Sequence, residues 1–148
     1  MSSDFTSENA RERQRLATLV ARLTDADLTR PIPTGWTVAT KLAHLAYWDQ
    51  YVLARLKSAQ RSGFQMISLS PLYDDINAAV RTLSDAIPPR AAADLAVAAA
   101  AAIDRHLETI SPDLRESIAS AGGERLLNRS LHRREHLDQI ERALLTRD

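Results

Sequence analysis

The chain has 148 residues, no cysteine, and 19 basic against 19 acidic side chains, which gives a formal net charge of zero at neutral pH. This length predicts one domain, over residues 1–148, with a core of its own. Zero net charge argues against binding to nucleic acid or to a membrane surface through bulk electrostatics. The lack of cysteine excludes disulfides, thiolate metal ligands and a cysteine nucleophile. Without an apolar run of membrane-spanning length or a secretory signal, we expect a soluble cytoplasmic protein.

The sequence favours an all-α fold, because Leu and Ala dominate it, only four glycines occur, and it has no Asn-Gly or Asp-Gly hairpin signal. A first helix is expected from about Ser7 to Leu23. Its apolar stripe comprises Leu16, Leu19, Val20 and Leu23. The segment from Thr24 to Thr34 is expected to be a linker, because Pro31 and Pro33 do not continue a helix.

A second helix is predicted from Thr37, a good N-cap, to about Gln60. Its buried face comprises Val38, Leu42, Leu45, Val52 and Leu56. After a loop over residues 61–70, Ser70-Pro71 combines a capping residue with proline at the first helical position, which predicts a third helix from Pro71 to about Ala86. The side chains expected to point inward from it are Leu72, Ile76, Ala79, Val80 and Leu83.

Two further helices are expected in the second half of the chain. Pro88-Pro89 starts a helix that runs to about Ile110 and contains an Ala-rich stretch over residues 91–102. Ser111-Pro112 ends this helix. Gly122-Gly123 then separates a short segment from a last helix, predicted from Glu124 to Leu145. Four or five helices joined by short connections predict a helical bundle.

Three of the four histidines are placed as ligands of one metal ion. His132 and His136 are four residues apart in the last predicted helix, so both imidazoles lie on one face and can converge on one point. A catalytic metal usually has three protein ligands. His44 is the candidate third ligand, because the apolar stretch around it should face the bundle. Taken alone, each of these residues is also explained as an ordinary core or surface histidine, and His106 as a boundary residue of its helix.

The string from His132 to His136 also matches H-x-x-E-H, the inverted zinc-protease pattern. Such an enzyme needs a further ligand later in the chain, and only twelve residues follow His136. Glu135 lies at i+3 from His132. In that position it can support a ligand or take part in catalysis, or it can be an ordinary solvated charge.

Four of the seven aromatic residues lie between Trp36 and Tyr51. Tyr47, Trp48 and Tyr51 follow His44 at i+3, i+4 and i+7, so they can share its helix face. This cluster has two interpretations. It can form the wall of a substrate pocket beside a metal, or it can close one end of the bundle.

Two segments of the chain together resemble the DinB-like superfamily, which includes the N-terminal domain of mycothiol-dependent maleylpyruvate isomerase. Gly35-Trp36-Thr37-Val38, followed by residues 42–49 (LAHLAYWD), is similar to the second-helix motif of that superfamily. Residues 131–140 (LHRREHLDQI) are similar to its final-helix motif. The order and separation of the two segments give the resemblance its specificity, and it spans roughly residues 10–145.

The resemblance implies a DinB-like four-helix bundle with an extra helix, residues 71–86, in the connection between helices 2 and 3. It also implies a divalent metal bound by His44, His132 and His136. Three neutral imidazoles suit Zn, Ni, Cu or Fe, and Zn and Ni are the first candidates. Characterised relatives use a low-molecular-weight thiol such as mycothiol, bacillithiol or glutathione. The maleylpyruvate isomerase branch commonly has Glu at the position of His132 and often carries a second domain, so the three-histidine branch is favoured.

The resulting hypothesis is a metal-dependent thiol S-transferase or isomerase that takes its thiol as a cosubstrate. Trp48 and Tyr51 are expected to line the substrate pocket, and Asn128, at i−4 from His132, to orient a ligand or substrate. The alternatives are a metal-dependent hydrolase and a non-enzymatic bundle that binds a metal or a small ligand. We also expect a small-molecule substrate and a homodimer, with no nucleic-acid or membrane partner.

Overall fold

The computed structural model describes residues 4–146, and within these residues every regular element is a helix. In chain order the elements are α1 (Thr6–Arg22), α2 (Asp25–Leu28), α3 (Val38–Ser62), the 3₁₀ helix η1 (Ser70–Leu72), α4 (Tyr73–Ser84), α5 (Pro89–Leu107), α6 (Pro112–Ser120), α7 (Glu124–Leu127) and α8 (Ser130–Leu145). One isolated antiparallel bridge joins Pro31 to Thr37, and the described residues contain no strand. The all-α prediction is confirmed. None of the helices within residues 4–146 is long and apolar enough to cross a membrane.

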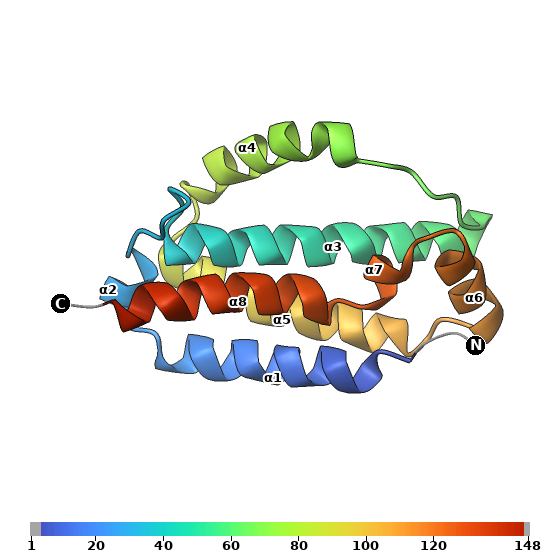
Figure 1. The fold of residues 1–148 in the computed structure, drawn as a ribbon, viewed down its shortest axis with the longest axis horizontal. Helices are drawn as coiled ribbons and strands as arrows, with labels where there is room; N and C mark the ends of the chain where they lie inside the picture. The colour runs from blue at the N-terminus through green and yellow to red at the C-terminus, as the bar shows by residue number, and fades with distance from the viewer. Residues whose placement is uncertain (1–3, 147–148) are drawn as a thin grey trace.

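Four long helices, α1, α3, α5 and α8, form a bundle (Figure 1). Both α3 and α1 pack against α5 and α8, so the four helices close a ring. The start of α1 lies near α6 and α7, and the end of α8 lies near α2 at the opposite end of the bundle. This arrangement places α3 and α8 side by side although they are far apart in the sequence, and the functional site depends on that contact.

The segment predicted as an extra helix forms η1 and α4, between the second and third helices of the bundle, and arches outside α3 (Figure 1). The predicted inward face is only partly correct. Val80 is buried, but Ala79 is exposed, and Leu72 and Leu83 are 49% and 70% exposed. The physical reason is that α4 packs mainly on α3 and does not enter the bundle, so a single edge of it is covered.

Local signals determine where α3 begins. The Thr37 hydroxyl accepts a hydrogen bond from the Thr40 backbone N–H (3.1 Å), and the Thr40 hydroxyl accepts one from the Thr37 backbone N–H (2.8 Å), which forms a capping box. Gly35 precedes this cap with φ of 86°, a left-handed conformation that glycine adopts without a steric penalty. Thr37 is therefore the N-cap, as predicted, and it sets the rotation of His44 about two turns later.

Two predicted boundaries need correction. The segment predicted as a linker, residues 24–34, contains α2, because Thr24 and Asp27 form a second capping box. Ser70 is not the N-cap of a helix but the first residue of η1, and α4 begins at Tyr73 without a side-chain cap. The linker prediction thus omits α2, and the predicted helix start at Pro71 lies two residues before the first residue of α4.

The last predicted helix is also interrupted, between α7 and α8. The buried side chain of Asn9, from α1, bonds to this junction three times. Its Nδ2 donates to the Leu127 carbonyl (2.9 Å), and its Oδ1 accepts from the backbone N–H groups of Arg129 (2.8 Å) and Ser130 (2.9 Å). A side chain from another helix thus satisfies backbone groups that the break leaves free, and it sets the start of α8 two residues before His132.

The core consists of two apolar clusters with a charged layer between them. The larger cluster lies toward α2 and includes Leu16, Leu28, Leu42, Leu45, Leu137 and Ile140, and the smaller lies toward α6 and α7 and includes Val52, Leu56, Ile103, Ile118 and Leu127. Between them, buried Asp49, Asp104 and Arg133 come from α3, α5 and α8. The predicted buried faces of α1 and α3 are confirmed.

Candidate metal centre

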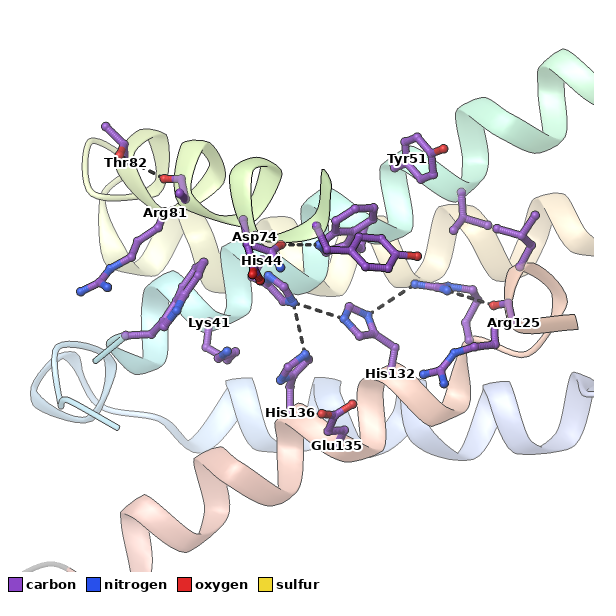
Figure 2. A pocket seen from close by; sticks show the side chains of 18 of the residues that line it. Lys41, His44, Tyr51, Asp74, Arg81, Thr82, Arg125, His132, Glu135 and His136 are labelled. Atoms are coloured by element: carbon purple, nitrogen blue, oxygen red, sulfur yellow. Dashed lines mark hydrogen bonds between the residues drawn. The ribbon is translucent and has the colours of Figure 1, made fainter. Parts of the chain in front are cut away.

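The three histidines predicted as ligands meet where α3 faces α8 (Figure 2). The Nε2 atom of His44 lies 3.2 Å from Nε2 of His132 and 3.2 Å from Nε2 of His136. Among the described residues, these side chains are the one group of three or more potential ligands close enough to hold a metal ion. The i,i+4 pair on α8 therefore points at the single histidine of α3, as its spacing indicated.

The spacing of the three nitrogen atoms fits a divalent metal ion. Tetrahedral Zn²⁺ has Zn–N bonds of about 2.0–2.1 Å, which separates two nitrogen ligands by about 3.3 Å. The observed separations of 3.2 Å from His44 to each partner agree with this value. Three imidazoles also suit Ni²⁺, and they leave coordination positions open for another ligand. The residues present can thus hold a divalent metal ion.

The surroundings of the three rings keep them neutral, which is the form that binds a metal. Burial lowers the pKa of His44 to about 3, with contributions from neighbouring His136 and Lys41. Burial also lowers the pKa of His132 well below its ordinary value, helped by the positive charge of Arg129, and it lowers the pKa of His136. Neutral imidazoles at neutral pH require no deprotonation step before a metal ion binds.

The outer nitrogen atoms of the three rings have different environments. Gln139 Oε1 lies 2.9 Å from His136 Nδ1 and accepts a hydrogen bond when that nitrogen is protonated, which directs the Nε2 lone pair toward the cluster. An Arg129 N–H lies 3.5 Å from His132 Nδ1 and favours the opposite tautomer. Buried His44 Nδ1 has no hydrogen-bond partner within the described residues. Support for the metal-binding tautomer therefore comes mainly from Gln139.

A buried ionic layer lies directly behind the histidines. Arg133 is fully buried and its guanidinium donates to Asp104 (2.8 and 3.0 Å) and to Asp49 (3.3 Å). Asp49 also accepts from Arg129 (2.9 Å), whose guanidinium reaches His132. Since these residues belong to α3, α5 and the start of α8, the layer ties together the helices that carry the ligands.

A cavity of about 1110 Å³ opens in front of the three histidines, between α3, α4 and the α7–α8 segment. One wall is aromatic. The Trp48 ring makes edge contacts with Tyr51 and Tyr73, with ring centroids 5.4 Å apart in each pair, and its Nε1 donates to Asn77 Oδ1 (2.9 Å). Trp36 lines the cavity from the other side, 5.4 Å from the His44 ring. Of the four aromatic residues between Trp36 and Tyr51, Trp36, Trp48 and Tyr51 thus contribute to the cavity wall, whereas Tyr47 is exposed and lies outside the lining.

Trp48 and Tyr51 lie on this wall, as predicted, although their role toward a substrate stays a prediction. Asn128 is outside the cavity lining, and its Oδ1 accepts hydrogen bonds from the backbone N–H (3.1 Å) and hydroxyl (2.5 Å) of Ser130. The placement of Asn128 beside His132 is wrong because the chain is not helical at that residue. His106 contacts Gln60 away from the cavity (2.8 Å), as expected for a boundary residue.

Several residues of the cavity were not singled out by the sequence. Lys41 lies three residues before His44 and Gln139 three residues after His136, so helical spacing alone could have indicated both. Asn77 and Arg81 come from α4, whose position over the cavity depends on tertiary packing. Glu135 also lines the cavity, where the Glu of an H-x-x-E-H protease would act as a base. The third member of the ligand cluster is His44, which precedes the histidine pair in the chain, so the further ligand that such a protease has after the pair is not matched.

Comparison with known proteins agrees with the fold and the site. The family model described as the DinB superfamily matches residues 8–145, which includes all three histidines and both motif segments. No curated protein and no solved structure matches the chain.

Proposed function

The chain belongs to the DinB superfamily, a metal-binding family, and on this basis and that of its three-histidine centre we propose that it is a metal-dependent thiol S-transferase. One observation carries most of the weight. Three neutral imidazoles converge at the base of a cavity in a protein that contains no cysteine. Such a protein can run thiol chemistry only when the thiol arrives as a cosubstrate.

His44, His132 and His136 would hold the ion, with Zn²⁺ or Ni²⁺ as the expected metal. A divalent ion held there would lower the pKa of a thiol that enters an open position and so supply a thiolate at neutral pH. Gln139 keeps the His136 ring in the orientation that this requires, and α4 covers the cavity from the side opposite α8. His44 and His136 are buried and His132 is half-buried, which limits the access of bulk water to the reacting groups.

The aromatic wall binds the second substrate, a small molecule with an electrophilic carbon. Trp48, Tyr51 and Tyr73 offer apolar ring surface in the same cavity as the histidines, where it can hold a bound molecule close to the thiol. In the reaction the sulfur forms a bond to that carbon, the leaving group departs with its bonding electron pair, and the thiol proton is released.

A conjugation assay tests this proposal. Zinc-loaded and nickel-loaded proteins are incubated with mycothiol, bacillithiol or glutathione and with monochlorobimane or 1-chloro-2,4-dinitrobenzene as electrophile. The proposal predicts an adduct that forms faster than the uncatalysed rate with wild type and His106→Ala, and not with His44→Ala. The absence of acceleration with every thiol, in protein shown to contain one metal ion per chain, would contradict it.

A second function is favoured by the position of Glu135. Its carboxylate lines the same cavity one turn from His132, where it can accept a proton from a water molecule that attacks a substrate (Figure 2). In that case the protein is a metal-dependent hydrolase and turns over ester substrates such as 4-nitrophenyl acetate without any thiol. Loss of this activity in Glu135→Gln, with metal content unchanged, would select the hydrolase. The expected homodimer also stays a prediction.

A further inference from the structure

One buried cation in the cavity takes no part in holding the metal. Lys41 lies one turn before His44 on α3 and is only 5% exposed. It lines the cavity, and Figure 2 shows its side chain beside His136, reaching toward the same space from the opposite helix. A lysine in this position is unusual, because Lys is almost never fully buried unless its charge is paired.

The ammonium group of Lys41 has no anionic partner. Within residues 4–146 it makes no hydrogen bond and no ion pair within 4.0 Å, and its Nζ lies over the Trp36 ring, 4.7 Å from the ring centroid. Glu135 is the nearest side chain of opposite charge that acts on it, from beyond ion-pair distance. The protein therefore partly desolvates the charge of Lys41 and compensates it only weakly, through Glu135 and the Trp36 ring.

The neighbourhood of Lys41 makes this imbalance larger. The group faces His44 and His136, so a divalent ion held by the histidines adds positive charge on the same side of the cavity. Arg81 is a second cation near Trp36. Its guanidinium lies 5.8 Å from the Trp36 ring and donates a hydrogen bond to the Gly35 carbonyl (2.5 Å). The Trp36 ring therefore contacts two cations, Lys41 and Arg81.

We propose that Lys41 and the face of Trp36 form a carboxylate-binding subsite next to the metal centre. A carboxylate there receives a charge-assisted hydrogen bond from the ammonium and compensates the local positive charge, while the rest of the molecule extends toward the aromatic wall. As the substrate site of a transferase the subsite rests on the proposed function, whereas binding of the anion itself does not. The carboxylate belongs either to the electrophile or to the thiol cosubstrate.

The chain provides its own probe and its own control for a test. Its only two tryptophans, Trp36 and Trp48, both line the cavity, so intrinsic fluorescence reports on ligands that enter it. Its only two lysines are Lys41 and the exposed Lys57. Lys41→Met keeps the length of the side chain and removes the charge at the subsite, and Lys57→Met removes the same charge from the surface. Metal content confirms that each variant retains the folded histidine cluster.

Benzoate, with benzamide as its neutral counterpart, is titrated into metal-free and zinc-loaded protein. Lys41→Met is expected to weaken benzoate binding about tenfold to hundredfold in both forms, the usual effect of losing a hydrogen bond to a charged group. Lys57→Met should change the affinity for benzoate less than about twofold, and neither substitution should change the affinity for benzamide. Equal benzoate binding by wild type and Lys41→Met, an equal loss in Lys57→Met, or no binding to wild type would overturn the subsite.

A second pair of probes identifies which substrate carries the carboxylate. Zinc-loaded wild type and Lys41→Met are titrated with 3-mercaptopropionate and with 2-mercaptoethanol. If Lys41→Met weakens the binding of 3-mercaptopropionate but not that of 2-mercaptoethanol, the subsite receives the carboxylate of the thiol. If Lys41→Met weakens the binding of benzoate but of neither thiol, the subsite receives the carboxylate of the electrophile. A further outcome is that the protein fails every conjugation assay and wild type still binds benzoate more tightly than Lys41→Met does. That result would reject the transferase but support the carboxylate subsite.

Discussion

Two buried polar clusters lie next to each other in this bundle, and they are completed in different ways. In the ionic layer, the charge of Arg133 is matched by Asp49 and Asp104, and all but one of its guanidinium nitrogen atoms, Nε, have partners. In the metal centre, three imidazoles and Lys41 gather without any carboxylate at hydrogen-bond distance within the described residues.

The difference separates structure from function. The ionic layer is complete within the protein, so it has the properties of a fold determinant that connects α3, α5 and α8. The metal centre contains three imidazoles and a nearby ammonium group but, in the part of the chain that the structure describes, no anionic side chain bonded to them. A cation would pair with the imidazole lone pairs, and an anion would pair with the ammonium. Buried polar groups that the protein leaves uncompensated indicate a ligand, and those that it compensates indicate stability.

The largest expected effect is on the ionic layer. Arg133→Met leaves Asp49 and Asp104 buried with reduced compensation, which should lower the free energy of unfolding by about 3–5 kcal/mol. Arg134→Met is the matched control, because Arg134 is exposed and its bond to Glu12 should contribute less than about 1 kcal/mol. Urea unfolding of both variants measures this. Similar stability of the two would contradict the structural role given to the layer.

The next effect concerns the pH dependence of the metal-free protein. The lowered pKa of His44 means that the unfolded chain takes up a proton near pH 6.5 while the folded protein does not until about pH 3. Stability from this residue is therefore complete above pH 6.5 and decreases as the pH falls, by about 2 kcal/mol between pH 6.5 and 5.

Urea unfolding at several pH values checks this, with His44→Leu expected to show a shallower slope than wild type. The comparison uses the slope, because the substitution also changes the stability at neutral pH. If the free energy of unfolding depends on pH equally in the two proteins, His44 is protonated in the folded state as readily as in the unfolded chain. That result would contradict the claim that the three histidines are neutral.

A smaller effect is expected from the support of His136. Gln139→Ala removes the acceptor of the Nδ1–H hydrogen bond, and loss of such a contact typically weakens metal binding by about tenfold to a hundredfold. Gln139→Glu, which keeps an acceptor in that place, should retain or increase the affinity. Competition with a zinc chelator measures both variants. Unchanged affinity in Gln139→Ala would mean that the hydrogen bond does not orient the ring.

The two clusters also differ in how far the sequence predicts them. His132 and His136 lie in one regular helix, so a spacing of four residues was sufficient to place them together, and His44 lies on an apolar helix face that could only point inward. Asp49, Asp104 and Arg133 carry no such signal, because a charged residue inside a helix is normally exposed. Their burial follows from partners on other helices, which local sequence patterns do not report.

The same limit explains the errors at the edges of the fold. Asn128 was placed by extending α8 through a junction that Asn9 of α1 interrupts from outside the segment. The apolar residues of α4 were assigned to a core that this helix touches along one edge. Helix identity and the ligand set follow from local spacing, whereas the break before α8 and the contribution of α4 to the cavity depend on tertiary contacts.

The most direct test of the metal centre combines metal analysis with X-ray absorption spectroscopy on untagged protein loaded with zinc. We predict one ion per chain, bound by three imidazole nitrogens at about 2.0–2.1 Å. His44→Ala, His132→Ala and His136→Ala should each lose most of the bound zinc, and His106→Ala should retain it. Full zinc occupancy in His44→Ala, or a zinc ion bound through fewer than three imidazoles in wild type, would contradict the account.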